Sequence, residues 1–299
     1  MLKLRGKSEQ SFKKTFKVVS SELLSSNSTQ CTVQFPLRVE ECWYDKHLAI
    51  FNKPPMVLSQ KPDMRTWYNT HEYSPPVLID LVESTYEHRL NSNESNRTFW
   101  PIHRIDTPVS GGIVYALTKQ SAQMFSKNLR VGGNAGYTLT RKYIAKVTTS
   151  EMMDRPKRGL FKLNGATTYF QRVDDKHVIF QLVTGKKHQI RKLSQHALHL
   201  PIYNDSKYGG ERIFDSDFQI ALHSAYVRTK IGFKTKEHIF PVPDGFRMIW
   251  GDSIDQNGNF SNNISQILKE DWTDSIKECL LKLKQQEVKP EDNRLVFVP

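Results

Sequence analysis

A polar loop that runs directly into an apolar strand is the feature that most constrains this chain. Residues 103–106 read His-Arg-Ile-Asp, residues 107–112 read Thr-Pro-Val-Ser-Gly-Gly, and residues 113–117 read Ile-Val-Tyr-Ala-Leu. The proline and the glycines predict a turn or loop, and the apolar run after them predicts a buried strand. We therefore expect an imidazole, a guanidinium and a carboxylate on a loop that a strand holds in place. Catalytic and binding residues are commonly found in such loops.

The length and charge of the chain restrict its class of partner. Its 299 residues are enough to bury a full core, and they predict one large domain with or without additions. The 43 lysine and arginine residues outnumber the 31 acidic residues by 12, which favours an acidic partner, either nucleic acid or an anionic membrane surface. No apolar run approaches the roughly 18 residues of a membrane span, so we expect none.

The cysteines and histidines argue against a metal site. Cys31, Cys42 and Cys279 are scattered without the spacing of zinc ligands, which also favours a reducing compartment. The ten histidines form no ligand cluster of the His-Glu-x-x-His kind. The sequence therefore predicts neither a metal nor another cofactor.

The first 30 residues are basic and rich in serine. Three interpretations stay open: a transit peptide, a basic arm that contacts phosphate, and a solvated disordered tail. We hypothesise a mitochondrial presequence within residues 1–35, with a cytoplasmic or nuclear location as the alternatives.

Hydrophobic periodicity predicts the remaining elements. Strands are expected at residues 48–51, 141–147, 167–173 and 178–183, and helices at 77–86 and 119–130. Residues 184–191 read Thr-Gly-Lys-Lys-His-Gln-Ile-Arg, with a glycine turn and a helix expected to begin near His188. A helix N-terminus beside three basic side chains is a good site for an anion.

Five stretches together resemble the RluA-type pseudouridine synthases. Residues 103–111 are similar to the His-Arg-Leu-Asp signature of that family, with Ile105 in place of the leucine. The other four appear in the family's order: the Asn-Lys-Pro opening at 52–54, the Arg-Lys-Tyr strand at 141–143, the His-Gln-Ile-Arg helix start at 188–191, and the block at 201–210. Departures at Lys186, Leu193 and Asn204 affect expected contacts with the RNA backbone more than the chemistry.

The resemblance implies a set of site residues. Asp106 would be the catalytic aspartate, acting as nucleophile or as base, Arg191 would pair with it and keep it ionised, and Tyr143 would lie against the target base. The residues expected to bind substrate are His103, Arg104, Lys186, Lys187, His188, Gln189 and Ile190.

The same resemblance implies an α+β fold, with a mixed, largely antiparallel sheet and flanking helices. We expect a catalytic domain at residues 36–250 that carries an insertion at 59–100. A helical extension at 251–299 would follow it.

The function expected is an RNA pseudouridine synthase that flips a uridine out of structured rRNA or tRNA, with mRNA also possible. Ribosomal subunit precursors are possible partners. The alternative is a catalytically silent RNA-binding assembly factor with the same fold. A metal-dependent nuclease fits poorly, because Asp106 has no partner carboxylates at the spacing of a metal site.

Overall fold

The computed structural model describes residues 10–17, 30–37, 39–63, 75–87, 98–131, 136–148, 156–214, 218–286 and 295–299. Within 10–17, 30–37, 83–87 and 130–131 the description covers the backbone alone.

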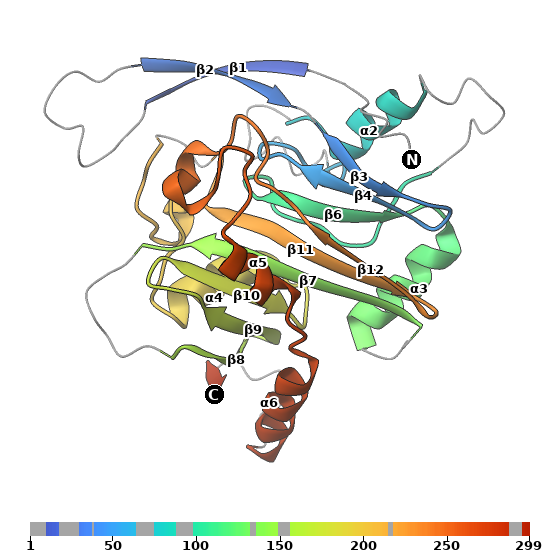
Figure 1. The fold of residues 1–299 in the computed structure, drawn as a ribbon, viewed down its shortest axis with the longest axis vertical. Coiled ribbons are helices and arrows are strands. Elements are labelled where there is room, and N and C mark those ends of the chain that lie inside the picture. The colour runs from blue at the N-terminus through green and yellow to red at the C-terminus, as the bar shows by residue number, and fades with distance from the viewer. Residues whose placement is uncertain are drawn as a thin grey trace, which may run out of the picture.

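One large sheet forms the centre of the molecule (Figure 1). Its eleven described strands follow the order β13-β8-β9-β10-β7-β11-β6-β4-β3, while β12 pairs with β11 and β5 with β6. Only β6 and β11 are parallel, so the predicted mixed, largely antiparallel sheet is confirmed. The strands are β3 (Glu40–Tyr44), β4 (Leu48–Lys53), β5 (Trp100–Pro101), β6 (Ser110–Ala116), β7 (Tyr137–Lys146), β8 (Arg158–Leu163), β9 (Ala166–Arg172), β10 (His177–Leu182), β11 (Leu222–Ile231), β12 (Lys234–Ile239) and β13 (Val296–Val298).

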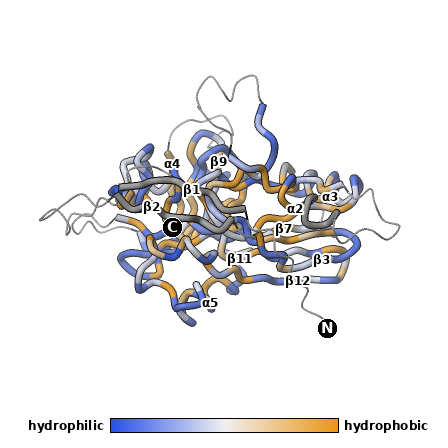
Figure 2. Tube along the Cα trace, turned by 90° about the horizontal axis from the view of Figure 1, so that it is seen from above, coloured by the Kyte–Doolittle hydropathy of each residue, from blue (hydrophilic) through white to orange (hydrophobic). Residues whose placement is uncertain are grey.

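The described helices pack around this sheet (Figure 1). The helices expected at 77–86 and 119–130 are confirmed as α2 and α3, and the one expected near His188 is α4. The helices are α2 (Leu78–Glu87), α3 (Lys119–Val131), α4 (Gln189–His196), α5 (Asn262–Lys269) and α6 (Thr273–Gln285), with short 3-10 helices η1 (Ser206–Tyr208) and η2 (Met248–Ser253). In Figure 2 apolar stretches of the tube run through the strands, and hydrophilic stretches lie mostly at the periphery.

The two faces of β7 separate the loops that carry the motifs from the C-terminal segment. Side chains alternate across a strand, so Arg141 and Tyr143 share one face and Lys142 and Lys146 share the other. Lys142 Nζ donates to the carbonyls of Ile267 (3.1 Å) and Glu270 (2.6 Å). These carbonyls belong to the end of α5, where a helix leaves its last carbonyls unpaired. The strand therefore binds the C-terminal segment through side chains of its second face.

The C-terminal segment is part of the sheet as well as a helical cover. After α5 and α6 the chain returns as β13, which pairs antiparallel with β8 at one edge of the sheet. Sequence patterning indicated helices here and missed this strand, together with β3, β5, β8 and β12. The location of residues 251–299 outside the catalytic domain stays a prediction of the sequence.

Gly111 allows β6 to lie against β11. Its φ is +110°, and a Cβ at this position would lie 2.4 Å from the carbonyl oxygen of Ser224. Any other residue would be strained at this position, because that φ is unfavourable for a residue with a side chain and backbone atoms fill the space. The glycine that follows the aspartate loop therefore determines how closely the two parallel strands approach.

The N-terminal strands form a separate pair. β1 (Gln10–Lys17) and β2 (Gln30–Leu37) run antiparallel to each other and do not join the large sheet (Figure 1). The sequence indicated a basic arm, a tail or a presequence for this region and did not indicate a hairpin. The hypothesis of a presequence stays a prediction.

Candidate active site

The loop that carries Asp106 is fixed by the end of β4 and the turn that follows it. The hydroxyl of Ser59 donates to the Ile105 carbonyl (2.7 Å) and accepts from the Ile105 N–H (3.1 Å). The Met56 N–H donates to the Thr107 carbonyl (2.9 Å). These bonds lie on both sides of Asp106, whose side chain keeps 29% of its surface exposed. The carboxylate is therefore held in position and open to a ligand.

A buried lysine also holds the loop that carries Asp106. Lys53 is completely buried, and its Nζ donates to the carbonyls of Pro54 (2.9 Å), Val57 (2.8 Å) and Thr107 (3.3 Å). Burial lowers the pKa of Lys53 to about 7, and the charge of Asp106 opposes this effect. Lys53 acts through the backbone of the loop, so its role is positional.

Arg191 lies between two carboxylates. Its Nη1 is 3.5 Å from Oδ2 of Asp106, while its Nε and Nη2 each donate a 2.7 Å hydrogen bond to Asp205. Asp205 is fully buried, so this two-point contact fixes the plane of the guanidinium. Burial alone would lower the pKa of Arg191, but the hydrogen bonds and charge of Asp205, with the charge of Asp106, raise it. A permanent cation thus faces the exposed carboxylate.

His188 and Tyr208 complete the surroundings of Asp106. His188 Nε2 lies 3.9 Å from Oδ2 of Asp106, and its Nδ1 lies 2.9 Å from the hydroxyl of Tyr208. The ring of Tyr208 also packs against Arg191, whose Cζ is 5.1 Å from the ring centre. Burial lowers the pKa of His188 to about 4. The charge of Asp106 opposes this effect, and the charge of Arg191 adds to it. The imidazole is therefore neutral at neutral pH.

Tyr143 lies in the interior beside the site. Only 3% of its surface is exposed, and β10 and β11 flank its strand. Burial raises the pKa of its hydroxyl and the charge of Asp106 adds to this, while Arg141 and a hydrogen bond with Ser224 act in the opposite direction. The charge of Asp106 is thus one of the influences on the tyrosine predicted from the sequence.

The residues expected to bind substrate fall into two groups. Arg104, Lys186 and Lys187 are exposed, and His188 is partly exposed beside Asp106. His103, Gln189 and Ile190 are buried. The first group can contact RNA in the described conformation, and the second group supports the architecture of the site.

Gln189 shows why burial matters for this division. Its Nε2 donates to the Thr167 carbonyl (2.9 Å) and the Thr168 hydroxyl (2.7 Å). Its Oε1 accepts from the Lys186 N–H (2.9 Å) and the Thr184 hydroxyl (3.1 Å). With these four contacts the amide holds the loop that presents the two lysines.

His103 is likewise directed into the protein. Its Nε2 accepts from the backbone N–H of Val114 (3.2 Å), and burial, followed by the nearby charge of Arg141, lowers the pKa of the imidazole well below its ordinary value. A neutral, buried imidazole that accepts from a strand supports the structure, and it does not face a substrate.

Sequence reasoning gave no role to four residues that shape the site: Asp205, Tyr208, Lys53 and Arg141. The first two lie in the block at 201–210, whose pattern was noted, and Lys53 lies in the Asn-Lys-Pro opening. Arg141 is two residues before Tyr143, and this period-two spacing was the available signal. Asp205 and Tyr208 contact Arg191 and His188, which lie 14 and 20 residues away, so the pattern alone did not reveal their roles.

No group of three or more His, Cys, Asp or Glu side chains in the described ranges is arranged to hold a metal ion. Within the same ranges, no helix has the length and apolar character needed to cross a membrane.

Comparison with known proteins defines the class. The profile described as RNA pseudouridylate synthase matches residues 47–196, a range that contains Asp106, Tyr143 and Arg191. The human protein "RNA Pseudouridylate Synthase Domain Containing 4" has a similar fold, with a TM-score of 0.51 at 18% identity over 70% of this chain and 91% of that one. The chain belongs to the RNA pseudouridylate synthase family and is an isomerase that acts on RNA.

Closer relatives narrow the resemblance further. A protein of Kluyveromyces lactis named "21S rRNA pseudouridine(2819) synthase" is 65% identical over 287 residues, which cover 96% of each chain. A protein of the same name from Saccharomyces cerevisiae is 39% identical and covers 76% of this chain and 94% of its own.

Proposed function

We propose that this enzyme isomerises a uridine of a mitochondrial 21S rRNA to pseudouridine. The support for this substrate is the 65% identity, along nearly the whole chain, to a relative named for that reaction. A 21S rRNA is the large-subunit rRNA of mitochondria, which agrees with the mitochondrial location expected from the basic N-terminal segment. The substrate would therefore be a structured RNA, as the sequence led us to expect.

The observation that carries the site assignment is the exposed carboxylate of Asp106 opposite a fixed cation. Asp106 would act on the ribose or the uracil of the flipped uridine, as nucleophile or as base, and it must be ionised to do so. Arg191 lies 3.5 Å away and is held by Asp205, so its positive charge would face the reacting groups without a rearrangement during the reaction.

The reaction would proceed by breaking the bond between N1 of uracil and C1′ of the ribose. The uracil then rotates, C5 forms the new bond to C1′, and the proton lost from C5 is replaced by one gained at N1. Tyr143, which the resemblance assigns to the target base, would contact the uracil and assist removal of the C5 proton. The exposed Arg104 would occupy the space that the flipped base leaves in the stack or hold the RNA backbone, and the uridine must be unstacked at a cost of a few kcal/mol.

The exposed lysines of the loop before α4 would hold the RNA backbone. Lys186 and Lys187 stand at the N-terminus of α4, where free backbone N–H groups and the helix dipole favour an anion. None of the described contacts favours the alternative of a silent assembly factor. Asp106 lies opposite Arg191, which Asp205 holds in place, and a protein that only binds RNA does not need this arrangement.

The experiment that tests the proposal combines a pseudouridine map of mitochondrial rRNA with assays of the purified enzyme on a transcribed 21S rRNA fragment. Asp106→Ala and the nearly isosteric Asp106→Asn should both abolish the product and leave RNA affinity within a few fold. A map identical to wild type in cells that carry Asp106→Ala would contradict the assignment of Asp106. A wild-type enzyme that modifies other RNAs and leaves 21S rRNA unmodified would contradict the substrate.

A further inference from the structure

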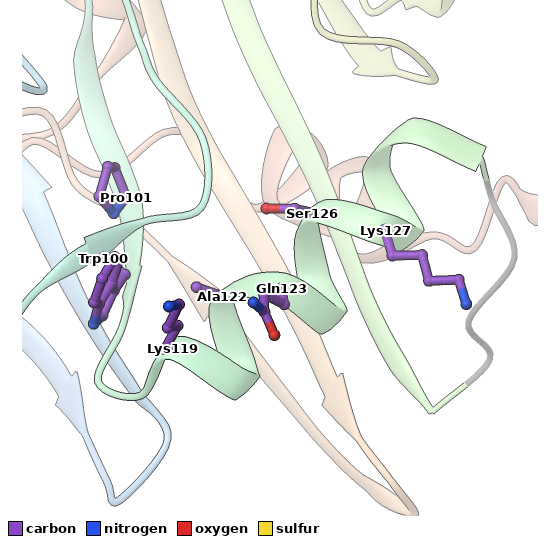
Figure 3. Close-up of a pocket in the computed structure, with 7 residues that line it drawn as sticks. All are labelled: Trp100, Pro101, Lys119, Ala122, Gln123, Ser126 and Lys127. Atoms are coloured by element: carbon purple, nitrogen blue, oxygen red, sulfur yellow. The ribbon is translucent and has the colours of Figure 1, made fainter.

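A groove lies between the free edge of β5 and helix α3, away from the aspartate loop (Figure 3). Its volume is about 660 Å³, and seven residues line it: Trp100, Pro101, Lys119, Ala122, Gln123, Ser126 and Lys127. β5 pairs only with the far end of β6, opposite Tyr115 and Ala116. β6 rises by six residue steps from Ser110 to Ala116, or about 20 Å. None of the seven lining residues belongs to the site around Asp106.

The floor of the groove is apolar and suits a flat ring. Trp100 is one of the few exposed large hydrophobic side chains in the described part of the protein, with 36% of its surface accessible. In Figure 3 its ring and the ring of Pro101 stand on one side, with Ala122 of α3 on the other. An accessible tryptophan beside small side chains can stack a nucleic-acid base, whatever its identity.

The wall of the groove is positively charged. Lys119, Gln123 and Lys127 follow each other at intervals of four residues, so they form one stripe along α3. The two lysines are about 12 Å apart along the helix axis, far enough to contact different phosphates of one strand. Both are exposed, and neither forms an ion pair with a described residue. The sequence of α3 contains no aspartate or glutamate, so nothing on the helix neutralises this charge.

We infer that this groove is a second RNA-binding site, which stacks a base on Trp100 and contacts the adjacent phosphates through Lys119 and Lys127. A basic helix that carries no acidic residue of its own, together with the exposed aromatic ring, favours RNA over a peptide. This inference rests on the proposed function, because the RNA is the same molecule whose uridine enters the site at Asp106. The groove would bind nucleotides that flank the target and so add affinity for long RNA.

The test measures the affinity of full-length protein for two RNAs by fluorescence anisotropy. One is a long 21S rRNA fragment that contains the target uridine, and the other is a short hairpin that cannot reach from Asp106 to the groove. Lys119→Glu with Lys127→Glu, and separately Trp100→Ala, should each weaken binding of the long RNA by about 10-fold or more and bring its affinity near that of the hairpin. Trp100→Phe keeps an aromatic ring and should restore most of the affinity.

The salt dependence supplies a readout that a structural defect would not imitate. Removing two phosphate contacts should reduce the slope of log affinity against log salt concentration by about 1.5. The matched control is Lys277→Glu with Lys284→Glu, two exposed lysines on α6 with the same change of charge, and it should leave affinity and slope unchanged.

The outcomes separate this inference from the proposed function. Wild-type affinity and slope in the Lys119 and Lys127 variant would overturn the inference, as would an equal loss in the α6 control, which would indicate a general effect of charge. A wild-type protein that binds the long RNA through the groove yet does not modify it would contradict the proposed substrate and leave the second site standing. Weakened binding of a partner protein with unchanged RNA binding would assign the groove to that protein and overturn the inference.

Discussion

Arg191 binds Asp205 more closely than it binds Asp106: its two contacts with Asp205 are 2.7 Å long, and the contact with Asp106 is 3.5 Å. One guanidinium thus connects a buried carboxylate with an exposed one. The closer pair holds the arginine in place, and the longer contact leaves Asp106 available to substrate. The contact with Asp205 is therefore structural, and the contact with Asp106 is the one through which Arg191 would act in the reaction.

The first prediction concerns this pair. Asp205→Ala removes the buried partner of Arg191 and leaves an uncompensated charge, so the free energy of unfolding should fall by about 3–5 kcal/mol. Urea denaturation measures this loss. The double variant Asp205→Ala with Arg191→Met removes both charges and should regain much of the stability.

The double variant should nevertheless have no activity, because the cation opposite Asp106 is missing. Recovery of stability with no recovery of turnover is the expected pattern. If Asp205→Ala alone kept wild-type stability and turnover, the contact between Asp205 and Arg191 would be needed for neither.

The second prediction concerns pH. The pKa of His188 is lowered from 6.5 to about 4, so the unfolded chain binds more protons than the folded protein between these values. Stability should therefore decrease as pH falls from 6.5 towards 4, and the His188 contribution to the decrease should be on the order of 1–3 kcal/mol. Above pH 6.5 this histidine contributes no pH dependence.

His188→Gln should flatten part of this decrease, and denaturation curves at pH 4.5, 5.5 and 7 would measure the difference. His223 is buried and its pKa is also lowered to about 4, so it should continue to contribute in the variant. An identical pH profile of stability for His188→Gln and wild type would contradict the assignment of a neutral imidazole beside Asp106.

The third prediction concerns the attachment of the C-terminal segment. Lys142 is buried, donates to two carbonyls at the end of α5, and lies 3.6 Å from the ring centre of Trp272. Lys142→Met keeps most of the volume and leaves those carbonyls without their donor. The free energy of unfolding should fall by about 2–3 kcal/mol.

The matched control is Lys277→Met on the exposed surface of α6, where the ion pair with Asp274 is exposed and should contribute less than about 1 kcal/mol. Thermal or urea denaturation distinguishes the two variants. Equal stability of Lys142→Met and wild type would mean that the C-terminal helices are attached by apolar packing alone.

Local sequence patterns were sufficient for much of the fold. The apolar run at 113–117 lies mostly in the buried strand β6, and the periodicity at 119–130 became α3. The loop expected at 107–112 is shorter than predicted, because β6 already begins at Ser110 and the two glycines at 111 and 112 belong to that strand. Periodicity could not reveal β13, because three residues that form an edge strand carry too few positions to show alternation.

The sequence by itself determined the class of fold, through its resemblance to a known family, and it singled out Asp106 and Arg191, because both lie in the motifs that carry that resemblance. The 3.5 Å contact between them agrees with the pairing that the resemblance implied, while their roles in the reaction stay predictions. Only the tertiary structure decided that Asp205 holds Arg191 and that Gln189 and His103 face inwards. The reason is physical: burial and long-range hydrogen bonds depend on which strands become neighbours, and nothing in a local pattern specifies that choice.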